Sequence, residues 1–119
     1  MSNASIVSIH PYFKVQSGKL EEFKSLLQEF VARTSTEEGC LHYHFTINGD
    51  VVFCREAYRD GDAALAHLDN VGQLIEKALG IAELLRLELH GGEAELAKLR
   101  DPLKDLNPQW FLYHTGVES

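Results

Sequence analysis

Histidine is frequent in this chain, with six in 119 residues. His42 and His44 alternate in a stretch of strand character, so both imidazoles should project from one face. A two-residue turn after that stretch would place Phe53 and Arg55 beside them on the same face. These four side chains suit an oxygen-rich planar ligand, because arginine donates to carbonyl or phenolate oxygens and histidine transfers protons near neutral pH. We predict a ligand-binding face here; a solvated polar face is the alternative.

A third histidine, His67, falls in a predicted helix between Leu65 and Leu68. Such a histidine is either packed at the rim of the core or positioned as a general base, whose pKa near neutrality suits proton transfer. His-x-His on a strand is also part of a metal motif, but no third ligand follows at a suitable spacing. We therefore expect no metal site.

Sequence motifs for other chemistry are missing. The chain has no GxSxG, P-loop, Rossmann or zinc-knuckle pattern. Gly91-Gly92 is too short to cradle a phosphate. We accordingly expect no flavin, nicotinamide or other cofactor held by a dedicated motif.

Size and charge restrict the function further. A chain of 119 residues with 45% hydrophobic and 24% charged residues predicts one globular domain over residues 1–119. The net charge of −7 argues against nucleic acid and anionic membranes as partners. Residues 1–5 lack the basic and apolar regions of a signal peptide, and no apolar run approaches the length of a membrane span. The expected location is the cytoplasm.

Hydrophobic periodicity and turn residues predict an α+β domain. The expected elements are a strand at 6–15, a helix at 19–35, strands at 40–47 and 50–58 around Asn48-Gly49, a helix at 63–68 continued over 70–79, a strand at 81–90, a helix at 93–106 and a strand at 109–114. The first six form the β-α-β-β-α-β order of ferredoxin-like domains, followed by an extra helix and strand. A sheet with helices on one side leaves its other face open, which predicts a homodimer.

Single residues predict where these elements begin, end or bend. Pro11 should interrupt the first strand or place it at a sheet edge, and Gly39 is a plausible stop for the first helix. Asp60 offers a cap for the next helix and Asn70 a cap for its continuation. Pro102 should kink or restart the last helix.

The two cysteines are expected to remain reduced. With Asn48-Gly49 as a two-residue turn, Cys54 lies opposite Tyr43 and Cys40 points to the other face of the hairpin. Shifting the register by one residue puts both on one face but about 13 Å apart along the strands. A disulfide needs Cα atoms within about 7 Å.

A set of residues spread along the chain makes it similar to the antibiotic biosynthesis monooxygenase domain family. They are Gly18, Glu38-Gly39-Cys40, Tyr43, Glu56, Tyr58, Asp60 and Ala66-His67. The resemblance covers about residues 6–90, leaves a C-terminal extension at 91–119, and implies ferredoxin-like protomers that pair into a dimeric α/β barrel. It also implies a cofactor-independent monooxygenase that oxidises a small aromatic or quinol-type substrate with molecular oxygen. His67 would then be the general base and Arg55 would stabilise the phenolate, with help from His42 and His44.

Some residues depart from the family pattern, and these departures bear on which activity of the family the chain could have. Haem-degrading members carry asparagine, tryptophan and histidine where this chain has Pro11, His67 and Lys77, so the resemblance does not extend to haem. Many quinol-type members have a second histidine where Gly72 stands. This favours the alternative of a non-catalytic small-molecule-binding or stress-associated dimer. A purely structural dimerisation module would need a cleft filled by side chains.

Overall fold

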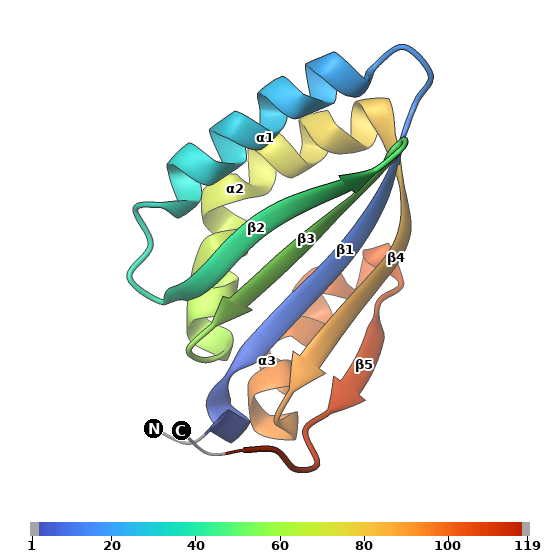
Figure 1. Cartoon of the computed structure of the whole chain (residues 1–119). Helices are drawn as coiled ribbons and strands as arrows, with labels where there is room; N and C mark the ends of the chain where they lie inside the picture. Colours follow the sequence, from blue (N-terminus) through green and yellow to red (C-terminus); the bar gives the residue numbers. More distant parts are fainter. Residues whose placement is uncertain (1–2, 118–119) are drawn as a thin grey trace.

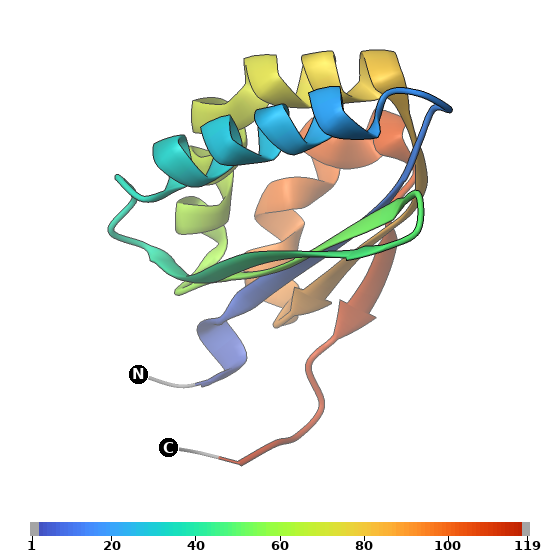
Figure 2. The ribbon, with the colours of Figure 1, turned by 45° about the horizontal axis from the view of Figure 1, so that its top comes forward.

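Three helices cover one side of a five-stranded sheet and leave the other side open (Figures 1 and 2). The computed structural model describes residues 3–117. Its elements are η1 (Asn3–Ser5), β1 (Val7–Val15), α1 (Leu20–Thr34), β2 (Cys40–Asn48), β3 (Val51–Tyr58), α2 (Gly61–Ile81), β4 (Ala82–Gly91), α3 (Glu93–Leu103), η2 (Lys104–Leu106) and β5 (Gln109–Leu112). Met1 and Ser2, which begin the segment without signal-peptide features, lie outside the described residues.

The strand order β2-β3-β1-β4-β5 confirms the ferredoxin-like prediction with an extra helix and strand. β5 runs parallel to β4, and the other neighbours are antiparallel. The edge position expected from Pro11 is wrong, because β1 is the central strand. Between Val7 and Lys14, its pairing with β3 is interrupted at His10 and Pro11, which is the other outcome expected from the proline, whose nitrogen has no hydrogen to donate.

The hairpin turn differs from the expected Asn48-Gly49. Asn48 pairs with Val51, so Gly49 and Asp50 form the turn. Gly49 has a positive φ of 63° and Asp50 does not, as in a type II′ turn with glycine first. The register therefore moves by two residues, which leaves the predicted faces unchanged.

The cysteines are free, as predicted, but their expected placement is wrong. Cys54 pairs with Phe45 rather than Tyr43. A register shift between Cys40 and His42 pairs Cys40 with Tyr58, and Cys40 packs against a buried cluster on the helix side. The bulge thus turns Cys40 to the face on which Cys54 lies.

α2 is one continuous helix rather than two segments. The Asp60 side chain accepts a hydrogen bond from the Ala63 N–H at 2.8 Å, which confirms the predicted cap. The predicted cap at Asn70 is wrong, since its side-chain amide bonds to groups outside α2 and leaves the helix uninterrupted. Gly39 does not end α1, which stops at Thr34.

The core consists of two clusters of buried side chains. The first lies between α1, the C-terminal part of α2 and the β2–β3–β1 part of the sheet. The second cluster lies between the helices and the other part of the sheet. The N-terminal part of α2, together with α3, packs there against β1, β4 and Tyr58 of β3. α3 contains Pro102 and continues as η2. No helix among residues 3–117 has the length and apolar character needed to cross a membrane.

Candidate active site

A pocket lies between the helix-covered face of the sheet and the helices, bounded by side chains of both core clusters. Its walls are aliphatic and aromatic residues from β1, β2, β4, α1, α2 and the α3–η2 segment, together with Cys54 of β3. The pocket is also lined by His67 of α2, which is 3% exposed, and by Glu56 of β3, which is 4% exposed. Functional groups buried among apolar side chains are the usual composition of a small-molecule site.

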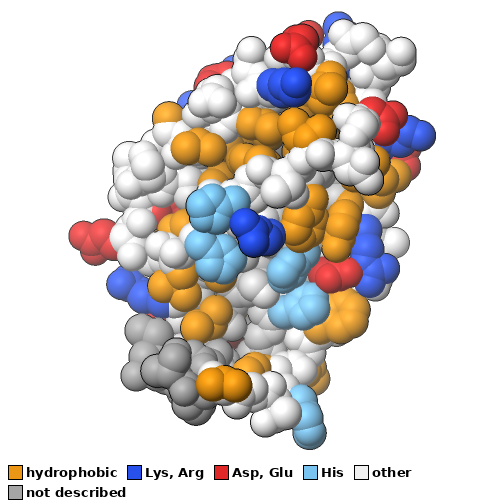
Figure 3. Space-filling view, in the orientation of Figure 1, with side chains coloured by type: hydrophobic (Ala, Val, Ile, Leu, Met, Phe, Trp, Pro, Cys, Tyr) orange, Lys and Arg blue, Asp and Glu red, His pale blue; other side chains and the backbone are white. Residues whose placement is uncertain are grey.

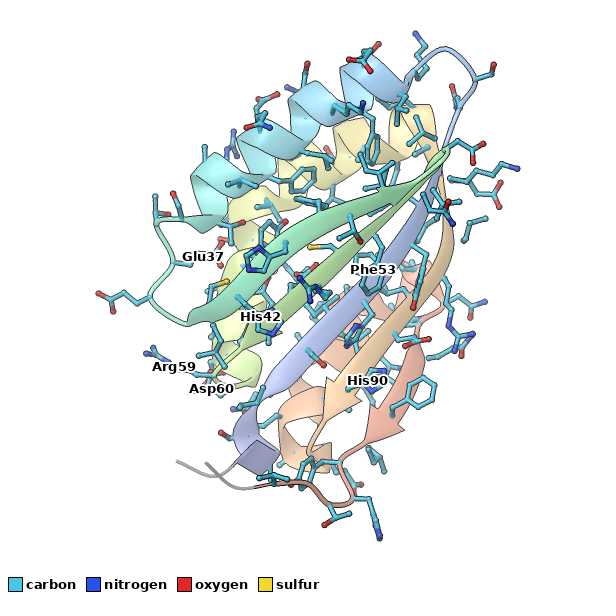
Figure 4. All side chains as sticks on the ribbon, in the orientation of Figure 1. Glu37, His42, Phe53, Arg59, Asp60 and His90 are labelled. Carbon is cyan, nitrogen blue, oxygen red and sulfur yellow. The ribbon has the colours of Figure 1, made fainter. Side chains whose placement is uncertain are left out.

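Glu37 orients the His67 ring from the segment between α1 and β2, where Figure 4 labels it. The ring nitrogen Nδ1 is 2.9 Å from Glu37 Oε2. Because an ionised carboxylate can only accept, Nδ1 carries the hydrogen and donates it. Asn70, one turn further along α2, donates a second hydrogen bond to Glu37 Oε2 at 2.8 Å. Nε2 of His67 is then left with a lone pair for proton transfer.

Glu56 faces this lone pair. Its Oε1 lies 3.4 Å from His67 Nε2 and accepts a hydrogen bond from the Tyr58 hydroxyl at 2.6 Å. Burial raises the pKa of Glu56 to about 7, although the Tyr58 and Cys54 hydrogen bonds work in the opposite direction. Near neutral pH, about half of the Glu56 side chains are therefore carboxylic acids that can give up a proton.

Aromatic rings enclose the imidazole. The ring centroids of Tyr43 and Tyr58 lie 5.2 Å and 4.9 Å from that of His67. Burial lowers the pKa of His67, and the hydrogen bond to Glu37 opposes this only in part. His67 is therefore neutral at pH 7. A neutral base and a protonated acid side by side can remove a proton from one ligand atom and deliver one to another.

The predicted ligand-binding residues lie on the opposite face of the sheet. His44 pairs with Arg55 and Thr46 with Phe53, whereas Cys54 and Glu56, the next residue after each of them in β3, line the pocket under the helices. The expected convergence of these groups with His67 in one hollow is therefore wrong. The physical reason is strand alternation, since His67 sits on the helix layer and reaches only every second residue of β3.

The open face has an aromatic and histidine cluster of its own (Figures 3 and 4). The ring of Phe53 lies 4.7 Å from that of Tyr12, and His90 stacks on Phe111 with ring centroids 4.5 Å apart. His42 and His44 stack on each other along β2 at 6.3 Å. Among the described residues, no three His, Cys, Asp or Glu side chains are grouped as metal ligands on either face.

The sequence contained signals for the acid–base residues that the predictions did not use. Cys54, Glu56 and Tyr58 are spaced two residues apart in β3, so strand periodicity places all three side chains on the same, buried face. Asn70 follows His67 by three residues, which puts both on one side of a helix. Glu37 had no such signal, because it lies in a loop 30 residues from His67.

Comparison with known proteins identifies the family and supports the fold. Residues 6–73 match the family described as antibiotic biosynthesis monooxygenase. MupZ from Pseudomonas fluorescens is 38% identical, with a TM-score of 0.89 over 96% of this chain and 94% of that chain. A conserved protein of unknown function from Bacteroides thetaiotaomicron is 22% identical, with a TM-score of 0.66 over 72% of this chain and 96% of its own. No functionally curated protein matches the chain.

Proposed function

Because this chain belongs to the antibiotic biosynthesis monooxygenase family, we propose that its pocket is the site of a cofactor-independent oxygenation of an aromatic or quinol-type substrate by molecular oxygen. The observation that carries the proposal is the acid–base pair in an apolar pocket. His67 presents an unprotonated Nε2, oriented through Glu37, and Glu56 is a carboxylic acid 3.4 Å away.

The reaction would begin with proton transfer. His67 removes a proton from an activated CH₂ group of the substrate and leaves a carbanion, R₂CH⁻, delocalised into the ring and its phenolic oxygen. The carbanion transfers one electron to O₂, and the resulting radical pair combines to R₂CHOO⁻. Protonated His67 returns its proton to the peroxide. The substrate itself is the reductant, so the scheme needs no further electron donor.

The second half forms the carbonyl group. Neutral His67 removes the remaining hydrogen of R₂CHOOH as a proton, the O–O bond breaks, and Glu56 protonates the departing hydroxide. The products are R₂C=O and H₂O, which balance R₂CH₂ and O₂. Proton transfer from His67 back to Glu56 restores both groups. The apolar walls support these steps, because a pocket with few polar partners protects the carbanion from protonation by water.

The proposal is tested by oxygen uptake. Flavin- and metal-free protein should consume O₂ with an anthrone as probe substrate, and His67→Gln should lower the rate by about 10²-fold or more, as expected for a general base. His114→Ala, an exposed histidine outside the strands and helices, is the matched control and should retain the rate. No uptake by the wild type, or an unchanged rate in His67→Gln, would reject the oxygenase proposal.

Gly72 favours one alternative, a binding protein that does not turn over its ligand. It lies within α2, has open space for 4 Å around the point where a Cβ would stand, and adds no second imidazole to the pocket. This alternative predicts that anthrones stabilise the protein against heat while oxygen is not consumed. Anthrone-dependent uptake lost in His67→Gln would exclude it.

We further propose that the open face pairs with a second copy of the chain, as members of this family typically form homodimers. Tyr12, Phe53 and Phe111 give this face its aromatic surface, while His42, His44 and Arg55 lie around them. The residues predicted to bind a ligand would then contact the partner protomer. Light scattering should give a dimer for the wild type and a monomer for Phe53→Asp, and a monomeric wild type would reject this arrangement.

A further inference from the structure

The pocket is long in comparison with a single ring. On α2 it is lined by a stripe that begins at His67 and continues through Val71 and Ile75 to Leu79. Twelve residues of helix separate its ends, which corresponds to about 18 Å along the axis. On β1 the lining residues run from Ile9 to Phe13, about 13 Å along the strand. The free space is therefore a slot that runs parallel to α2.

The two ends of the slot differ in polarity and exposure. At one end are His67 and Glu56, both buried. At the other end, Ile75, Leu79 and Leu84 are only partly buried, so this end is closer to solvent. A ligand entering there would place its leading group against the acid–base pair and leave the remainder along the slot.

The C-terminal extension provides part of the wall. Leu103 and Leu106, at the end of α3 and in η2, line the slot opposite the α1 residues Phe23 and Leu27. Phe23, Leu27 and Leu103 are buried, and Leu106 packs against the second cluster. The walls along this part are hydrocarbon on both sides, which suits an aliphatic chain because such a chain gains affinity in proportion to its buried apolar area.

The polar end favours an uncharged head group. The residues that line the slot include no lysine or arginine. The acidic side chains at this end are Glu56, which lines the slot, and Glu37, which is hydrogen-bonded to His67. A carboxylate or phosphate would approach these acidic groups with no cation to offset them. A hydroxyl or carbonyl oxygen could instead accept a hydrogen bond from protonated Glu56, and a hydroxyl could also donate one to His67 Nε2.

We propose that this slot binds amphipathic molecules that consist of a neutral, oxygen-bearing head and an unbranched aliphatic arm. The head lies against His67 and Glu56, and the arm extends along α2 toward Leu79 and the α3–η2 segment. This deepens the proposed oxygenase function by specifying its substrate class: a reacting ring that carries an alkyl substituent. Binding of the arm does not require turnover, so the two proposals are tested separately.

The test is a calorimetric titration of the purified chain with 1-hexanol, 1-octanol and 1-decanol. Each buried methylene contributes about 0.8 kcal/mol, so affinity should rise about fourfold for every CH₂ added. Decanoate at pH 8 should bind at least tenfold more weakly than 1-decanol. Affinity that does not depend on chain length, or decanoate binding as tightly as 1-decanol, would overturn the proposal.

Variants locate the arm within the protein. Ile75→Trp fills the middle of the slot and Leu79→Trp its outer end, and each should weaken 1-decanol binding at least tenfold. Leu85→Trp is the matched control, because Leu85 is exposed on β4 and does not line the slot. Two variants are used so that a folding defect in one does not decide the result. Unchanged 1-decanol affinity in a folded Ile75→Trp or Leu79→Trp protein would reject this placement.

A measurement on His67→Gln separates the two proposals. This variant should keep the fourfold dependence on chain length while losing oxygen uptake. A chain-length dependence in a wild-type protein that never consumes oxygen would leave the slot assignment intact and remove the oxygenase. Oxygen uptake with an anthrone but no binding of the alcohols would support the oxygenase proposal and reject the slot proposal.

Discussion

Replacing Glu56 with glutamine should stabilise the protein, by an amount that grows with pH. Burial raises the pKa of Glu56 from its ordinary value of 4.5 to about 7. The folded state thus holds this proton more tightly than the unfolded state. The contribution of Glu56 to the free energy of unfolding is therefore most favourable below pH 4.5 and is lost as the pH rises from 4.5 through 7. With about 1.4 kcal/mol for each pKa unit, the ionised carboxylate costs about 3 kcal/mol above pH 7.

Glu56→Gln keeps the shape of the side chain and its carbonyl can still accept the Tyr58 hydrogen bond, but it carries no charge at any pH. Between pH 5 and pH 8, the free energy of unfolding of the variant should increase relative to wild type by about 2–3 kcal/mol. Urea unfolding at both pH values measures this, with the protein concentration held constant because dimerisation would contribute to stability. Glu76→Gln, an exposed carboxylate on α2, is the control and should follow the wild type.

The difference between Glu56→Gln and wild type is the decisive quantity. Other groups, including His67, also titrate between pH 5 and pH 8, but most of their contribution is common to both proteins. If the two stability curves run parallel over this range, Glu56 ionises in the folded state as easily as in the unfolded chain. The general acid of the proposed mechanism would then be absent at neutral pH.

Four further outcomes are expected. The pH profile of kcat/KM should be bell-shaped, with activity lost below the lowered pKa of His67 and above about pH 7 as Glu56 ionises, and Glu56→Gln should remove the alkaline limb. Glu37→Gln should reduce kcat by about 10²–10⁴-fold with little change in KM, measured as oxygen uptake, because the His67 tautomer is no longer held. Gly39→Ala should lower the free energy of unfolding in urea by about 1–3 kcal/mol, since its Cβ would lie 2.5 Å from that of Ala63. Gly72→Ala, with open space around it in α2, should instead be neutral or stabilising by up to about 1 kcal/mol.

Alternation along the strands predicted which hairpin residues share a face, except at Cys40, where a bulge reverses the face. In β1 the same alternation places Val7, Ile9 and Pro11 under the helices and His10 and Tyr12 on the other side. The order of strands and helices also followed from local patterns, because the Gly49 turn and the Asp60 cap are set by neighbouring residues. Of the two outcomes expected from Pro11, the interruption of pairing is found and the edge position is wrong, because a central strand tolerates the loss of one ladder bond.

Local patterns could not predict which face of β2 and β3 meets the helices. Both faces of β2 carry ring-bearing side chains. Tyr43 and Phe45 lie on one face and His42 and His44 on the other, so the residue types alone did not show which face is buried. The outcome depends on the helices, which bury Val52, Cys54 and Tyr58. The contact between His67 and Glu37 joins a helix to a loop 30 residues away, and only tertiary packing creates it.

Under the proposed function, different parts of the chain determine the chemistry and the choice of substrate. Glu37, Glu56 and His67 all fall within residues 6–73, the part that matches the family. Leu103 and Leu106 lie beyond it, in an extension that an alignment over 96% of the chain shares for the most part with MupZ. The Bacteroides structure aligns over 96% of its own length but only 72% of this chain. Under the proposal, the part of this chain that matches the family supplies the acid–base end of the slot, and the extension supplies part of the wall that selects the ligand.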